Sequence, residues 1–216
     1  MIENGSGSVI VCGTTGSGKS YFIGKAIHSL IGRPDARLVL IDPKMVELEE
    51  YRLASNCLWY ADDEEEIYTV MCNTYELMMD RYRRMKAAGQ KNSDEAHVYI
   101  FIDEMAALLE TEYKKQYIKM MARIALMGRA ARVHMVLGTQ VATRDTIPSA
   151  IRNNVPTIVC LRQQDARTQK YLLDCKLPEL PERGFAYVKL PTARPVKVET
   201  DKAWSYIMRG GQEHEA

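Results

Sequence analysis

The sequence predicts an α/β fold in which a mostly parallel sheet is flanked by helices. Short apolar runs alternate with helical patterns along most of the chain, and such alternation is typical of parallel strands joined by helices. A glycine-rich phosphate-binding motif lies between the first apolar run and the first helical pattern, its usual place in such folds. Beyond Pro178 the chain changes to β-prone runs punctuated by proline, which predict an antiparallel pair at the sheet edge.

Each element is expected from its own pattern. The parallel strands are expected at Val9–Cys12, Leu38–Ile41, Val98–Ile102, Met135–Gly138 and Thr157–Leu161. Helices are expected at Tyr21–Leu30, at 63–88, where apolar side chains recur every three or four residues, and at Lys114–Ala131. A polar loop at 89–94 separates the long helix from the next strand. The antiparallel edge is expected at Phe185–Lys189 and Pro195–Glu199.

Composition and charge restrict the class of protein. At 216 residues, with 46% hydrophobic and 26% charged residues, one globular domain is expected. The 29 Lys and Arg against 28 Asp and Glu give no overall basic field, so a polyanion would have to be held by local loops. Five widely spaced cysteines favour reduced core thiols in a cytoplasmic protein. No apolar run is long enough to span a membrane, so insertion by this segment is not expected.

The phosphate-binding motif is complete. Gly13–Ser20 satisfies G-x-x-x-x-G-K-[ST], directly after an apolar run and before a helical pattern, and this setting disfavours a mere Gly/Ser-rich turn. Its glycines let backbone N–H groups turn toward the phosphates of ATP. Lys19 would reach the β- and γ-phosphates, and Ser20 would bind Mg²⁺. The expected nucleotide-binding residues are Gly13, Thr14, Thr15, Gly16, Ser17, Gly18, Lys19, Ser20 and Tyr21.

Polar residues end two later strands. Asp103 and Glu104 follow the run 98–102; Asp103 would hold Mg²⁺, and Glu104 would orient and deprotonate the water that attacks the γ-phosphate. The alternative is a solvated helix entry, because acidic side chains suit the first turn of a helix. Gln140 ends the run 135–138 and is the candidate sensor of the γ-phosphate, against an ordinary amide at a strand end.

Three segments together resemble the FtsK/SpoIIIE DNA translocases of the FtsK-HerA superfamily. These are Gly13–Ser20, Leu40–Leu48 with its Asp-Pro-Lys sequence, and Ile102–Leu108. Further matches in the same order are Arg81–Met85, Gly128–His134, Thr139–Gln140 and Ile151–Thr157, so the resemblance covers about residues 8 to 190. It implies a RecA-like motor domain that assembles as a ring, usually a hexamer, and uses ATP hydrolysis to pump double-stranded DNA through its pore.

The resemblance also implies roles for individual residues and boundaries. Each active site of such a ring lies between subunits, so a positive side chain from a neighbour should stabilise the transferring phosphoryl group. Arg129 is the first candidate and Arg167 the second, the alternative for each being a solvated surface arginine. Lys44 also follows a strand end near the site, and its role is left open. The expected organisation is a flexible leader or trimmed remnant at 1–8, the motor domain at 9–208 and a polar tail at 209–216.

Contacts with DNA are the least defined part of the sequence. No basic stretch with interleaved aromatic residues is present, so the candidate pore loops are 113–117 and 143–145, and their alternative is a solvated surface. Any such grip would be on phosphates and largely independent of sequence. Nothing after Lys197 resembles the winged-helix module of chromosomal translocases, and nothing before Gly13 resembles their extra subdomain. The short loop at 89–94 fits a compact version from a conjugative or mobile element, and a larger parent chain, with a membrane tether elsewhere, is an open alternative.

Two other functions stay open at this point. Type VII secretion motors use similar domains to move polypeptides, although the Asp-Pro-Lys segment at 42–44 resembles the DNA pumps more closely. A nucleotide-gated interaction module with little turnover is the third interpretation. Glu104 argues against it, because degenerate modules commonly lack the base.

Overall fold

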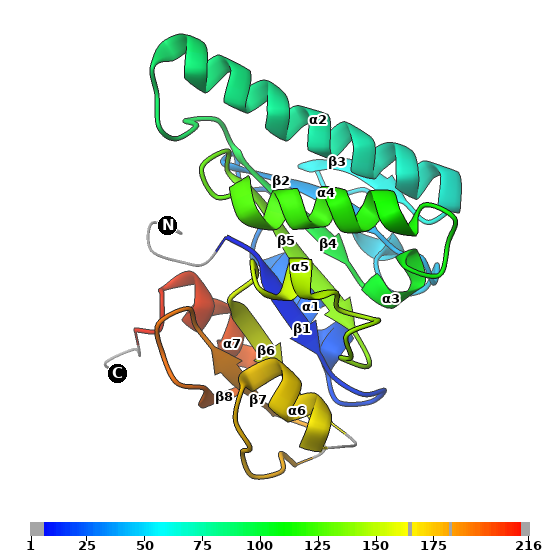
Figure 1. Cartoon of the computed structure of the whole chain (residues 1–216), viewed down its shortest axis with the longest axis vertical. Coiled ribbons are helices and arrows are strands. Elements are labelled where there is room, and N and C mark those ends of the chain that lie inside the picture. The colour runs from blue at the N-terminus through cyan, green and yellow to red at the C-terminus, as the bar shows by residue number, and fades with distance from the viewer. Residues whose placement is uncertain (1–6, 164–165, 182, 213–216) are drawn as a thin grey trace.

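The computed structural model describes residues 7–163, 166–181 and 183–212. Most of the expected leader and the end of the expected tail, together with Asp165 beside the candidate Arg167, lie outside these ranges. Figure 1 shows a layered arrangement in which helices cover both sides of a central sheet.

Within the described residues, eight strands form one sheet in the order β3-β2-β4-β5-β1-β6-β7-β8. The first six strands along the chain pair in parallel, and β7 and β8 pair antiparallel at the edge, which confirms the predicted fold class. The bounds are β1 Val9–Cys12, β2 Ala36–Ile41, β3 Cys57–Ala61, β4 His97–Ile102, β5 Val133–Thr139, β6 Thr157–Cys160, β7 Phe185–Lys189 and β8 Val196–Glu199.

The helices cover the two faces of the sheet with separate apolar clusters. The helical bounds are α1 Lys19–His28, η1 Glu49–Tyr51, α2 Glu64–Ala88, α3 Met105–Leu108, α4 Lys114–Met127, α5 Ser149–Arg152, α6 Ala166–Leu173 and α7 Thr200–Met208. One cluster joins α2 and α4 to the sheet, and Figure 1 shows these two helices side by side. The other joins α1 and α7, where Phe22 and Trp204 meet edge to face at 6.2 Å. None of the described helices is both long enough and apolar enough to cross a bilayer.

The sequence patterns missed six elements, η1, β3, α3, α5, α6 and α7, and the helix before β5 was predicted too long. The elements η1, α3 and α5 have only three or four residues each, too few to show a helical period. β3 is an edge strand whose side chains are mostly half-buried, so it lacks a clear apolar run. α6 and α7 are only eight and nine residues long, too short for a strong helical period. The helix expected to reach Ala131 ends at Met127, because the chain turns at Gly128. A Cβ there would lie 2.2 Å from the carbonyl oxygen of Val133, so only glycine fits this turn.

Parallel pairing places the functional segments at one edge of the sheet. β1 lies between β5 and β6, and β4 lies between β2 and β5. Because parallel strands point the same way, the loops that follow β1, β4 and β5 leave the sheet together. Gly138 in β5 makes this approach close: a Cβ would lie 2.1 Å from the carbonyl oxygen of Asp103. This arrangement brings together the phosphate-binding loop, the acidic pair and Gln140, although they lie far apart in the sequence.

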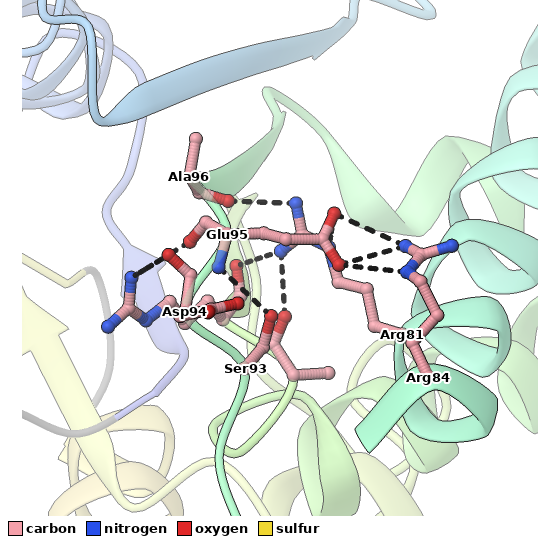
Figure 2. Close-up of polar contacts among 8 residues, drawn as sticks. Arg81, Arg84, Ser93, Asp94, Glu95 and Ala96 are labelled. Atoms are coloured by element: carbon pink, nitrogen blue, oxygen red, sulfur yellow. Dashed lines mark hydrogen bonds and ion pairs between the residues drawn. The ribbon is translucent and has the colours of Figure 1, made fainter. Parts of the chain in front are cut away.

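At the end of the sheet opposite the phosphate-binding loop, a buried arginine of α2 holds two connecting segments in place. The Arg81 side chain is 5% exposed, and its guanidinium donates to the carbonyl oxygens of Ala131 at 2.7 Å and Ala96 at 2.8 Å. Its Nε lies 3.5 Å from Oε2 of Glu95, which Arg84 also binds (Figure 2). One side chain thus ties α2 both to the loop before β4 and to the turn before β5.

We expect Arg81→Met to lower the free energy of unfolding by about 2 to 4 kcal/mol, because buried carbonyl groups lose their donors. The matched control is Arg83→Met on the exposed side of the same helix, where the side chain is 64% exposed. Its surface ion pairs predict a change below about 0.5 kcal/mol. Urea unfolding of both variants measures the difference, and equal losses would contradict the anchoring role of Arg81.

Two histidines form a second buried link at this edge. His134 Nδ1 lies 2.7 Å from the carbonyl oxygen of Gly7, so this nitrogen carries the proton and donates. Nε2 of His134 then accepts from Nδ1 of His97 at 2.8 Å. A second proton on His134 would place two N–H groups face to face. Burial, followed by the nearby His97, lowers the pKa of His134 to about 3.

This depressed pKa makes stability fall in mild acid. Between about pH 6.5 and pH 3 the unfolded His134 binds a proton that the folded one does not, so its stabilising effect is complete above pH 6.5 and is lost on acidification. We expect a loss of about 2 kcal/mol between pH 7 and pH 5, measured by urea unfolding. His134→Gln should reduce this loss, whereas His28→Gln at an exposed position should not. If the free energy of unfolding falls equally with pH in wild type and in His134→Gln, His134 is not the group responsible for the loss.

Candidate active site

The glycine-rich loop joins β1 to α1 with two residues in the left-handed region. Gly16 has φ 78° and Gly18 has φ 97°, so both positions favour glycine. Gly18 is the N-cap of α1, and no side chain caps this helix start. Gly13 is packed tightly, because a Cβ would lie 2.3 Å from Ser17 Oγ and 2.8 Å from the Cβ of Leu161. The loop therefore presents an uncapped, positively polarised helix start to the space above it.

A cavity of about 570 Å³ lies against this loop. It brings together residues from the loop, the end of β4 and the end of β5, as the parallel register requires. Its lining residues are Thr14, Thr15, Gly16, Gly18, Lys19, Ser20, Tyr21, Lys44, Glu47, Asp103, Gln140, Arg183, Gly184, Thr200 and Asp201. Two expected binding residues, Gly13 and Ser17, are buried beneath it. The Ser17 hydroxyl has no hydrogen-bond partner among the described residues.

Lys19 and Asp103 form a buried ion pair at the cavity wall. Lys19 Nζ lies 2.8 Å from Asp103 Oδ1 and donates also to the Asp103 carbonyl oxygen at 2.7 Å. Both side chains are under a tenth exposed. The two charges thus neutralise each other inside the protein, where an isolated charge would be costly.

Glu104 is held from two sides. Its Oε2 lies 3.2 Å from Nζ of Lys44, and its Oε1 accepts from the backbone N–H of Gln140 at 3.3 Å. The Gln140 side chain in turn accepts from the Thr15 hydroxyl at 3.4 Å. Gln140 therefore connects the end of β5 both to the acidic pair and to the phosphate-binding loop.

Four lining residues carried no signal in the sequence: Arg183, Gly184, Thr200 and Asp201. Arg183 donates from Nε to the carbonyl oxygen of Gly16 at 3.1 Å, and the Tyr21 hydroxyl donates to Asp201. The four come from the turn before β7 and from the start of α7, more than 150 positions beyond the loop. Only the pairing of β7 with β6 brings them close, so no local motif could have indicated them.

The two candidate trans arginines lie outside this cavity. Arg129 is exposed in the turn before β5, at the opposite edge of the sheet from the phosphate-binding loop. Arg167 is on α6 and lines a second cavity of about 620 Å³. That cavity also contains Arg144, Arg152 and Lys170, so one of the candidate DNA loops, 143–145, meets Arg167 there.

The other candidate DNA loop, 113–117, has a structural role for its tyrosines. Tyr113 stacks on Tyr68 at 4.0 Å and donates to Oε1 of Glu65 at 2.8 Å. Tyr117 is fully buried in the core. Only the lysines and the glutamine at 114–116 are exposed, so this segment offers two cations without aromatic support.

The cysteines near the loop are inert. Cys12 and Cys160 are direct neighbours in β1 and β6, and burial raises the pKa of each thiol, that of Cys160 to about 12. Both therefore stay protonated near neutral pH and are poor nucleophiles. None of the five cysteines, all in described positions, forms a disulfide.

The fold and this site define a RecA-like P-loop nucleotide-binding protein. Residues 2–100 match the model of the FtsK/SpoIIIE family. DNA translocase FtsK of Corynebacterium efficiens is 31% identical over 193 residues, 77% of this chain, and DNA translocase SftA of Bacillus subtilis is 30% identical over 210 residues, 88% of this chain. The chain belongs to the FtsK/SpoIIIE family. It spans only 20% and 22% of the length of these two relatives.

Solved structures agree with this fold. The pCW3 conjugation coupling protein TcpA superposes with a TM-score of 0.73 at 20% identity, covering 95% of this chain and 65% of that protein. EssC from Geobacillus thermodenitrificans, ATPases 2 and 3, gives a TM-score of 0.71 at 17% identity, covering 96% of this chain and 44% of that protein. At such identities the likeness concerns the fold alone.

Proposed function

We propose that this chain is the ATP-hydrolysing motor portion of a cytoplasmic DNA translocase, acting on double-stranded DNA as a ring of identical subunits. The convergence of Lys19, Ser20, Asp103 and Gln140 on one cavity, with Glu104 directly beside it, is the observation that carries the proposal. The relatives that are 30 to 33% identical over most of this chain are DNA translocases, which favours DNA over a secreted polypeptide.

The residues around the cavity fit ATP and Mg²⁺. The uncapped start of α1 and the unpartnered, buried Ser17 hydroxyl are suited to an anion, and nucleotide phosphates bind at such helix starts. The Ser20 hydroxyl and the Asp103 carboxylate would hold Mg²⁺. When bound, the metal ion neutralises charge on the phosphate oxygens.

Different residues of this chain would carry out different parts of ATP hydrolysis. Lys19 would exchange Asp103 for the β- and γ-phosphates, so that its charge stabilises the transferring group. Glu104 would accept the proton of the attacking water as the water oxygen bonds to the γ-phosphorus and the bond to the ADP oxygen breaks. Gln140 contacts both Glu104 and Thr15, so it would report whether the γ-phosphate is present.

The position of Arg129 favours action between subunits. It lies at the edge of the sheet opposite its own cavity, so it could reach an active site only on a neighbouring subunit. A ring built from head-to-tail contacts brings opposite surfaces of neighbouring subunits together.

Contact with DNA would be made by local groups of cations, because the chain has a net charge of only +1. Arg144, Arg167 and Lys170 of the second cavity are the favoured group, because Arg152 there is paired with Asp174. The idea of a compact form from a mobile element still rests on loop length.

Steady-state ATP hydrolysis tests the proposed function. The chain is assayed over a range of concentrations, with and without long double-stranded DNA, and Glu104→Gln is the blank. Stimulation by DNA that rises cooperatively with protein concentration is expected, because the active sites form between subunits. Indifference to DNA in an oligomeric sample would favour the secretion ATPase, and nucleotide binding without turnover would favour the interaction module.

We expect an Arg129→Ala subunit to be rescued by a Glu104→Gln subunit in mixed rings. In an equal mixture about a quarter of the interfaces combine an intact Glu104 with an intact Arg129, so about a quarter of the wild-type rate should return. Each variant alone should be nearly inactive. The matched control is Arg123→Ala on the exposed surface of α4, which should keep its activity without a partner. If no mixture recovers activity, Arg129 is not the trans residue.

A further inference from the structure

Both members of the acidic pair are neutralised by lysines of the same chain. Lys19 contacts Asp103, and Lys44 contacts Glu104 at 3.2 Å. The second oxygen of Glu104 accepts from the Gln140 backbone at 3.3 Å, so both of its oxygens are engaged. Glu104 is 5% exposed and is not among the described residues that line the cavity, although Lys44, Asp103 and Gln140 are.

Lys44 is placed by a tightly held turn. Asp42, at the end of β2, is fully buried, and its Oδ2 accepts from the backbone N–H groups of Val46, Glu47 and Leu48 at 2.8 to 3.0 Å. Met45 adopts φ 58°, which reverses the chain within this turn. Such a network fixes the backbone on both sides of Lys44. The lysine is therefore directed at Glu104 by the fold, while its side chain remains 40% exposed.

This arrangement conflicts with the work of a general base. A carboxylate accepts a proton from water only through an oxygen that water can reach. With Oε2 on Lys44 and Oε1 on the Gln140 backbone, each oxygen of the buried Glu104 already has a partner within the chain, and Glu104 does not line the cavity in the described structure. Lys44 is the more exposed of the two partners and can leave without disturbing the sheet.

We propose that Lys44 is a positioning residue that restrains Glu104: the closed Lys44–Glu104 pair keeps the subunit slow, and opening of the pair releases Oε2 to accept the proton of water. This inference rests on the proposed function, in which Glu104 is the general base. It assigns the pair as the point at which DNA or a neighbouring subunit would control the rate, because any contact that draws the Lys44 ammonium away frees the carboxylate.

Kinetics of Lys44 variants test this restraint. We expect Lys44→Met to raise the DNA-free kcat by about two- to fivefold, as for the loss of a partly exposed ion pair, and to reduce the stimulation by DNA by the same factor. KM for ATP should stay within about twofold, because binding is not the step released. Lys44→Gln should behave in the same way, and Lys44→Arg, which keeps the charge, should restore the slow DNA-free rate.

Lys86→Met, an exposed lysine at the far end of α2, is the matched control and should leave kcat unchanged. Thermal unfolding of each variant shows whether the chain stays folded. A lower or unchanged kcat in folded Lys44→Met and Lys44→Gln, while wild-type turnover still requires Glu104, overturns the restraint and leaves the proposed function standing. A raised KM with a lower kcat would make Lys44 a phosphate contact instead. If neither wild type nor Lys44→Met turns over ATP, with or without DNA, both the restraint and the proposed function fail.

Discussion

The arrangement of this chain depends on the parallel pairing of β1, β4 and β5. These strands lie far apart in the sequence, yet their common direction brings the phosphate-binding loop, the acidic pair and Gln140 to the same edge. The pairing is close enough that Gly138 leaves no room for a Cβ against the Asp103 backbone. Apolar clusters on both faces of the sheet keep this edge in place, so the site is rigid at its base and adjustable only in its side chains and outer loops.

The charges at this edge are arranged in pairs. Lys19 with Asp103 and Lys44 with Glu104 give each buried carboxylate a partner, which offsets much of the cost of removing it from water. The same partners would have to be exchanged before phosphate, metal ion or water can use these groups. These lysines and carboxylates are therefore paired within the chain, and a polyanion would replace the carboxylates as partners of the lysines.

The two edges of the sheet serve different purposes. The carboxyl end of the sheet has the cavity, whereas the opposite end has the Arg81 network and the His97–His134 pair, each hydrogen-bonded and centred on a buried residue, Arg81 or His134. The Arg81 network fixes the turn from which Arg129 projects. In the proposed head-to-tail ring, this fixed turn would hold Arg129 toward the cavity of the next subunit, because the reach of one arginine side chain is short.

The sequence by itself determined the chain's class, because its strongest signals are local. Alternating apolar runs specified five of the six parallel strands, and Gly13–Ser20 specified the loop, whose glycines adopt φ 78° and 97°, values that other residues rarely adopt. It did not indicate β3, whose side chains are mostly half-buried, or the short helices η1, α3, α5, α6 and α7. Only the tertiary structure decided that Arg183 and Asp201 line the cavity, that Arg129 lies away from it, and that Lys44 contacts Glu104. These contacts join residues 60 to 180 positions apart, and their distances are set by strand order and packing, which no local pattern encodes.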